Sequence, residues 1–180
     1  MMLSTCLSFV IVLLVSLNEV SASPTGIVTQ GDFTLVWLQT KNYTDYHSFK
    51  LKATNIDPPP YPKTNWIGFG LGINNYTMGN NDIAICANDF SFKPGHYYAA
   101  TAARPKLLDP KDPSIGFSDK TTYVDETTFI CYFARAKKMN GVLNYFDLSG
   151  KQEYYILFAS GPLYDNGKGK SFSGLVTCFF

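Results

Sequence analysis

The sequence predicts an all-β protein built as an antiparallel two-sheet β-sandwich. Aromatic residues make up 16% of the chain, with 12 Tyr and 14 Phe, a composition that favours packed sheets over disorder. Apolar and polar residues alternate with a period of two in several segments, which is the pattern of half-buried strands. Turn-forming residues separate these segments, and no long segment has a helical period. Many antiparallel strands joined by turns are typical of a sandwich.

The expected strands follow one another along the chain. Alternation predicts the first two at residues 33–37 and 49–53, where Lys50 and Lys52 lie opposite the apolar face. Runs rich in β-branched and aromatic residues predict further strands at 66–71, 83–87, 96–101, 128–133 and 154–159. Turns are expected at 58–60, 74–75, 79–81, 94–95, 140–141 and 161–162, and a long exposed loop at 106–119.

The N-terminal segment has the features of a secretory signal peptide. Residues 6–15 form an apolar run, and the small-x-small triplet Val20-Ser21-Ala22 follows it. A run of about ten apolar residues is too short to cross a bilayer, which takes about 20. We therefore expect residues 1–22 to be removed. A single secreted domain over residues 23–180, with no transmembrane segment, would remain.

The charge balance argues against one class of partner. The formal net charge of the whole sequence is +1, and the lysines and arginines form no cluster. Nucleic acids and anionic membranes attract proteins through a strong positive patch. The sequence therefore predicts no nucleic-acid partner and favours a small molecule or an extracellular protein.

Cysteine usage predicts one disulfide. Cys86, Cys131 and Cys178 remain after signal cleavage, and two of three cysteines are expected to pair in an oxidising compartment. Cys86 and Cys131 each lie in an apolar run of strand type, where facing positions reach disulfide distance. We favour Cys86–Cys131 with Cys178 unpaired. Cys86–Cys178 and Cys131–Cys178 are the alternatives.

Two sequons, Asn42-Tyr43-Thr44 and Asn75-Tyr76-Thr77, predict N-glycosylation of Asn42 and Asn75 on exposed loops.

The sequence lacks motifs that would predict a catalytic activity. It contains no HExxH or CxxC metal motif, no GxSxG elbow and no P-loop. Asp82, Asp89, Asp125 and Glu126 follow no pairing pattern, so we expect them at the surface. The glycine-rich segment 68–72 lies inside a strand pattern, which indicates close strand packing and not phosphate binding.

An ordered series of short motifs runs through most of the chain. It consists of WIGFGLG at 66–72, Met78 in the next loop, GNNDIAIC at 79–86, Arg104-Pro105, FICYFAR at 129–135 and YYILFASGP at 154–162. In order and spacing the series resembles the DOMON domain of the ferric-chelate reductase type, over roughly residues 30–175. The resemblance implies an immunoglobulin-like sandwich that binds haem or a sugar. It also implies that Trp66 and Tyr155, in core strands, are buried.

The same resemblance names candidate haem ligands. In haem-binding members, a methionine thioether and a histidine imidazole hold the iron in both redox states. Met78 matches the loop methionine. The matching histidine is expected between residues 163 and 173, where this sequence has none. His96 is the nearest candidate for the second ligand to haem b, ahead of His47 near the first sequon.

Two classes of function follow from these observations. The first is a secreted DOMON-domain protein that acts as an extracellular ligand-binding or interaction module. The alternative is a small b-type haem protein for extracellular electron transfer, related to ferric-chelate reductases. The missing histidine favours the first class. A cleft lined by Phe and Tyr suits haem, a sterol or a sugar.

Overall fold

The computed structural model describes residues 25–39, 45–55, 64–73, 80–87, 94–100, 105–150, 152–165, 170–172 and 175–178. Within these ranges every regular element is a β-strand and no helix occurs. No described segment forms a helix that could span a membrane. The signal segment 1–22, both sequons and Met78 lie outside the described residues.

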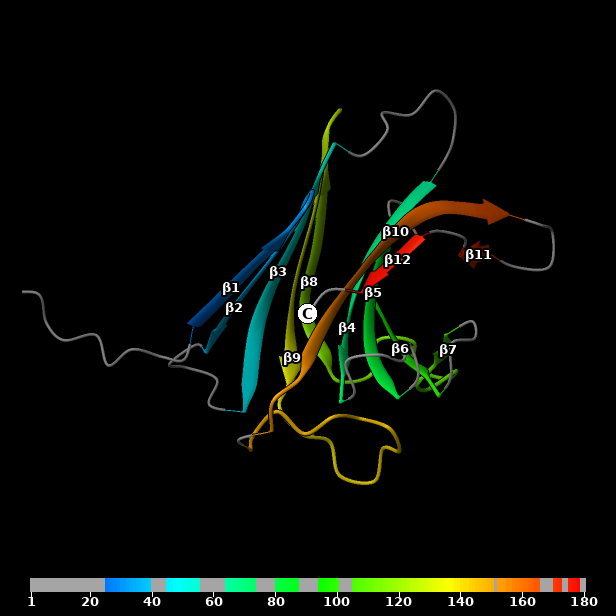
Figure 1. The fold of residues 1–180 in the computed structure, drawn as a ribbon. Coiled ribbons are helices and arrows are strands. Elements are labelled where there is room, and N and C mark those ends of the chain that lie inside the picture. The colour runs from blue at the N-terminus through cyan, green and yellow to red at the C-terminus, as the bar shows by residue number, and fades with distance from the viewer. Residues whose placement is uncertain are drawn as a thin grey trace, which may run out of the picture.

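Two antiparallel sheets form a β-sandwich, as the sequence predicts (Figure 1). The first sheet has the strand order β1-β2-β3-β9-β8. Its strands are β1 (Thr25–Gln30), β2 (Phe33–Gln39), β3 (Tyr46–Thr54), β8 (Phe117–Val124) and β9 (Thr128–Ala136). The second sheet has the order β11-β10-β4-β5-β6-β7, and β12 also pairs with β10. Its strands are β4 (Thr64–Gly72), β5 (Asn81–Ala87), β6 (Gly95–Ala99), β7 (Lys106–Leu107), β10 (Tyr155–Asp165), β11 (Lys170–Phe172) and β12 (Leu175–Cys178).

The core lies between the two sheets and is rich in aromatic side chains. Alternation along β3 points Phe49 and Leu51 inward and leaves Lys50 on the opposite face. Phe49 meets Phe69 of β4 with ring centroids 5.4 Å apart, so this contact joins the sheets. Phe133 of β9 stacks on Phe49 at 5.6 Å. Offset and tilted aromatic pairs of this kind add to the stabilisation from apolar burial.

A disulfide between Cys86 of β5 and Cys131 of β9 also joins the sheets, which confirms the favoured pairing. Both half-cystines are fully buried in the core. A buried disulfide is compatible with an extracellular protein. Cys178 lies in β12 opposite Leu157, and its unpaired thiol stays a prediction.

The expected burial is confirmed for Trp66 and wrong for Tyr155. Trp66 is 6% exposed, in a second apolar cluster on the face of the sheet that points away from the first sheet. Tyr155 is 38% exposed because Ile156, its neighbour in β10, takes the inward position. In a strand with a period of two, only one residue of the Tyr154-Tyr155 pair can face the core.

The glycines of β4 allow close strand packing, as expected. A Cβ atom on Gly68 would lie 2.8 Å from the carbonyl oxygen of Ala84 on β5.

The prediction of a long exposed loop at 106–119 is only partly correct. Residues 106 and 107 form β7, and Phe117 begins β8 with a buried side chain. Between them, the Pro113 carbonyl oxygen accepts a hydrogen bond of 2.7 Å from the backbone N–H of His96. The segment therefore packs against β6 instead of projecting into solvent.

Candidate functional site

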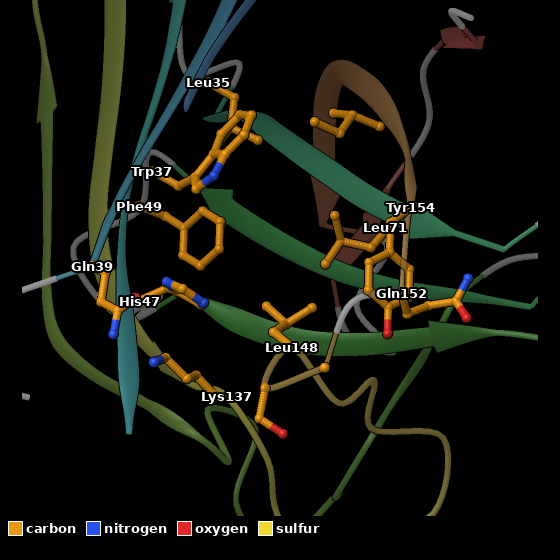
Figure 2. A pocket seen from close by; sticks show the side chains of 13 residues that line it. Leu35, Trp37, Gln39, His47, Phe49, Leu71, Lys137, Leu148, Gln152 and Tyr154 are labelled. Atoms are coloured by element: carbon orange, nitrogen blue, oxygen red, sulfur yellow. The ribbon is translucent and has the colours of Figure 1, made fainter. Parts of the chain in front are cut away.

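A cleft of about 400 Å³ opens between the sheets (Figure 2). Its apolar walls consist of Leu35, Trp37, Phe49, Leu71, Leu148, Tyr154 and Ile156. Its polar lining consists of Gln39, His47, Lys137, Ser149 and Gln152, with Gly150 beside them. This volume falls within the usual range for small-molecule sites, and a mainly apolar wall with a few polar groups is their usual composition.

The period of two in β2 and β3 places the cleft residues of these two strands on one face of the sheet. Trp37 and Gln39 follow Leu35 at two-residue steps, and His47 precedes Phe49 by two residues. The indole of Trp37 lies directly against β1 at Gly26, where a Cβ atom would come within 1.9 Å of the ring. Gly26 therefore leaves the space that the Trp37 ring occupies in the wall of the cleft.

The connection between β9 and β10 closes the cleft at one end of the sandwich. This segment, residues 137–154, is the yellow-to-orange loop at the lower edge of Figure 1. The backbone N–H of Lys137 donates to the Asp45 carbonyl oxygen at 2.8 Å, and that of Leu148 donates to the Lys137 carbonyl oxygen at 2.6 Å. The first hydrogen bond holds the start of the loop beside Asp45, which precedes β3, and the second folds the loop back onto Lys137.

A buried group of charged side chains lies at the same end of the sandwich. Asp82 of β5 accepts a hydrogen bond from His96 of β6 at 2.6 Å and one from Arg135 of β9 at 2.6 Å. None of the three is more than 3% exposed. Burial alone would raise the pKa of Asp82, but Arg135, His96 and the Phe146 N–H outweigh it and lower the pKa to about 2. The Asp82 carboxylate is therefore ionised at neutral pH.

Both ring nitrogens of His96 have a hydrogen-bond partner. Its Nε2 faces the Asp82 carboxylate, and its Nδ1 lies 2.9 Å from the Ile115 carbonyl oxygen. Both ring nitrogens are therefore engaged. The ring also stacks on Phe117 at 4.4 Å.

This buried charged group also fixes the loop that walls the cleft. The Phe146 N–H donates to Asp82 at 2.9 Å, and Arg135 donates to the Phe146 carbonyl oxygen at 2.8 Å. The Arg135 guanidinium lies over the Tyr145 ring, 4.2 Å from its centroid. Gly116 allows this arrangement, since a Cβ atom there would lie 2.6 Å from the Tyr145 ring. The position of the loop therefore depends on charges buried beside the cleft.

His47 differs from His96 because one of its ring nitrogens has no hydrogen-bond partner among the described residues. One backbone hydrogen bond joins its ring to Leu148, while its buried Nδ1 has no partner within the described residues. Burial lowers the pKa of His47, and the cations Lys137 and Arg135 lower it further. The ring is therefore neutral near pH 7 and offers an unsatisfied acceptor inside the sandwich.

The structure places the sequence-predicted site residues in different surroundings. Met78, Asn42 and Asn75 fall outside the described residues. His96 is fully buried with both ring nitrogens hydrogen-bonded, so neither nitrogen is free to bind iron in this arrangement. Within the described residues, no cluster of three or more His, Cys, Asp or Glu side chains could hold a metal ion.

The expectation that the four carboxylates lie at the surface is wrong for Asp82. Its side chain faces the core because β5 presents residues 82, 84 and 86 inward. Arg135 and His96 stabilise the buried carboxylate there. Asp125 and Glu126 are exposed as expected, while Asp89 falls outside the described residues.

Several residues of the cleft received no role from the sequence. A usable signal existed for Trp37, and also for His47, which the sequence offered only as a less favoured haem ligand, since alternation places both on the inward face of adjacent strands. No comparable signal existed for Lys137 and Leu148. Their place depends on how a loop folds back over the sandwich.

No known protein-family model matches this chain, and a search of curated proteins finds no match. The DOMON resemblance therefore stays a prediction from the motifs.

Proposed function

We propose that the protein is an extracellular binding module that holds a small, mainly apolar molecule between its sheets. The observation that carries this proposal is the aromatic cleft of about 400 Å³, which is lined in part by His47, a residue whose buried Nδ1 has no partner among the described residues. Trp37, Phe49 and Tyr154 offer flat apolar surfaces, and burying apolar ligand surface contributes about 25 cal/mol per Å². A ligand group that reaches His47 Nδ1 would give this buried nitrogen a hydrogen-bond partner.

The fold supports a site that exists before the ligand arrives. The disulfide and the aromatic core fix the two sheets, and the buried charges at Asp82 hold the loop that closes the cleft. Preorganised walls lower the entropy cost of binding. The DOMON resemblance, which implies a bound ligand, supports the same proposal.

A neutral fluorescent probe, N-phenyl-1-naphthylamine, tests the site. The chain has two tryptophans, so in a Trp66→Phe background Trp37 is the only tryptophan and reports on the cleft. We expect saturable probe binding with energy transfer from Trp37. Leu148→Phe, which fills the cleft, should weaken binding several-fold. Leu143→Phe is the matched control, because Leu143 lies on the same loop but is 83% exposed. Absence of saturable binding, or equal effects of the two variants, would refute the proposal.

The extracellular location is part of the proposal and has its own test. The apolar run at 6–15, the Val20-Ser21-Ala22 triplet and the buried disulfide support it. We expect the protein collected from the medium of secreting cells to begin at Ser23. N-terminal sequencing that begins at Met1 would contradict signal cleavage.

The b-type haem protein is the second candidate. The DOMON resemblance favours it, and His47, which lines the cleft, has a ring nitrogen without a partner among the described residues. The fixed hydrogen bonds of His96 count against the ligand pair Met78 and His96. We therefore rank this candidate below the apolar-ligand module.

A further inference from the structure

The charges around the cleft are unbalanced. Lys137 lines it, and no Asp or Glu is among its described lining residues. Within the described part of the chain, no carboxylate forms an ion pair with Lys137. Of the neighbouring carboxylates, Asp82 binds His96 and Arg135, and Asp147 binds Lys138 at 3.2 Å. Asp45, whose carbonyl oxygen accepts from the Lys137 backbone N–H, forms no ion pair with the Lys137 side chain. Lys137 is thus a cation without an ion-pair partner among the described residues, beside an apolar cavity.

His47 lies at the same end of the cleft. Figure 2 shows its ring next to the Lys137 side chain, with Leu35 and Trp37 at the opposite end. Arg135 is the register partner of His47 on β9, but Asp82 already neutralises that guanidinium. An anion placed here would offset the charge of Lys137 and stabilise the protonated form of the His47 ring.

We propose that the cleft selects an amphiphile with one anionic head group, a carboxylate or sulfonate, bound at the Lys137 and His47 end with its apolar body toward Leu35 and Trp37. This inference rests on the proposed function and names the chemical class of its ligand. Hydrogen bonds to charged groups are the stronger class, so the head group should improve affinity over a neutral analogue on the order of tenfold.

Binding of the anion should also take up a proton. In the free protein His47 is neutral because of burial, Lys137 and Arg135. The other ionisable groups nearby are Asp45 and Tyr46, which precede His47 in the chain, Tyr154 in the wall of the cleft, and the Asp147–Lys138 pair. An anion next to the ring favours its protonated form. Affinity for an anion should therefore rise as the pH falls from about 8 to about 5, the range in which histidine titrates.

Two probes with the same aromatic body test the inference. 8-Anilinonaphthalene-1-sulfonate carries an anionic group, and N-phenyl-1-naphthylamine is its neutral counterpart. We expect the full-length mature protein to bind the sulfonate about ten times more tightly than the amine. Lys137→Met should bring this ratio close to one. Lys138→Met is the control and should leave the ratio unchanged, because Lys138 is exposed and paired with Asp147.

Measuring the affinities at several pH values distinguishes the contribution of His47 from that of Lys137. A sulfonate stays ionised across the range used, so any change in its affinity reports on the protein. We expect the wild type to lose affinity for it as the pH rises, and His47→Gln to lose most of this dependence. The proposed preference for an anionic head group is wrong if the amine saturates the cleft but the sulfonate binds no more tightly. It is also wrong if Lys137→Met and Lys138→Met have the same affinity ratio. In either case the proposal of an apolar-ligand module stands. If neither probe saturates, both proposals are wrong.

Discussion

Asp82 holds the buried charges together, because its carboxylate accepts hydrogen bonds from His96, Arg135 and the backbone of Phe146. Removing one member of a buried ionic group leaves the others uncompensated, which typically costs about 3–5 kcal/mol. The three contacts also connect β5, β6, β9 and the loop over the cleft. The effect of changing this residue should therefore reach the binding site.

Substitution Asp82→Asn should lower the free energy of unfolding by about 3–5 kcal/mol. The lowered pKa of Asp82, about 2, adds a pH test. A carboxyl group with a lower pKa in the folded state than in the unfolded state stabilises the folded state at pH values above its unfolded pKa. This contribution is lost as the pH falls through the folded-state pKa. The free energy of unfolding of the wild type should thus fall by about 2 kcal/mol between about pH 4 and about pH 2 through this carboxyl group. The free energy of unfolding of Asp82→Asn should not show this contribution.

Urea denaturation at several pH values measures both effects. Asp125 and Asp147 also have lowered pKa values, through hydrogen bonds to Thr127 and Ser149 respectively. They titrate in both proteins, so the difference between the two curves isolates Asp82. Glu126→Gln, at an exposed position, is the control and should leave the midpoint unchanged. Parallel curves for wild type and Asp82→Asn would mean that the carboxylate does not stabilise the fold.

Trp66 and Tyr155 give a matched pair of aromatic substitutions. Trp66→Ala removes a buried side chain and should cost about 3–5 kcal/mol. Tyr155→Ala removes a ring that is 38% exposed, so its cost should be about 1 kcal/mol or less. Equilibrium denaturation measures both values. A larger loss for Tyr155→Ala would show that the inward and outward faces of β10 are assigned the wrong way round.

At the level of elements, the strands predicted best are those with one buried face. The apolar alternation of β2, β3 and β9 is visible in the sequence because the core requires it. The strands β1 and β8 lie at the edges of their sheet and have mostly polar or exposed residues, so their sequence has little pattern. The loop over the cleft follows no local pattern, because its position depends on Asp82 and Arg135, which precede it in the chain.

The disulfide is the covalent link between the sheets, and its removal should destabilise the sandwich. Cys86 and Cys131 are 45 residues apart, and closing a loop of that length stabilises the folded state by about 4 kcal/mol in the chain-entropy account. We expect Cys86→Ala/Cys131→Ala to lower the free energy of unfolding by about that amount. Peptide mapping without reduction should recover the Cys86–Cys131 pair. A linked peptide containing Cys178 would identify a different pairing.

At the scale of the whole molecule, the fold and the resemblance lead to different expectations for haem. The sandwich offers an apolar cleft, which could hold a porphyrin loosely, but low-spin iron needs two fixed axial ligands. The sequence has no histidine between residues 163 and 173, and His96 uses both nitrogens within the buried charged group. Freeing Nε2 would break the contact that helps to neutralise Asp82, and freeing Nδ1 would break the hydrogen bond to the Ile115 carbonyl oxygen. Ligation by His96 would therefore compete with the stability of the fold.

We expect protein purified from a haem-sufficient host to lack stoichiometric low-spin haem. The physical reason is that a single thioether such as Met78 is a weak ligand, so affinity would rest on apolar burial alone. A reduced-minus-oxidised spectrum measures this directly, and sharp α and β bands at full occupancy would contradict the expectation. Met78→Ala, His47→Ala and His96→Ala, made separately, would then identify the ligands. If both His47→Ala and Met78→Ala lose the bands, the iron lies in the cleft and the electron-transfer function is favoured. Loss in His96→Ala would instead require the buried charged group to open.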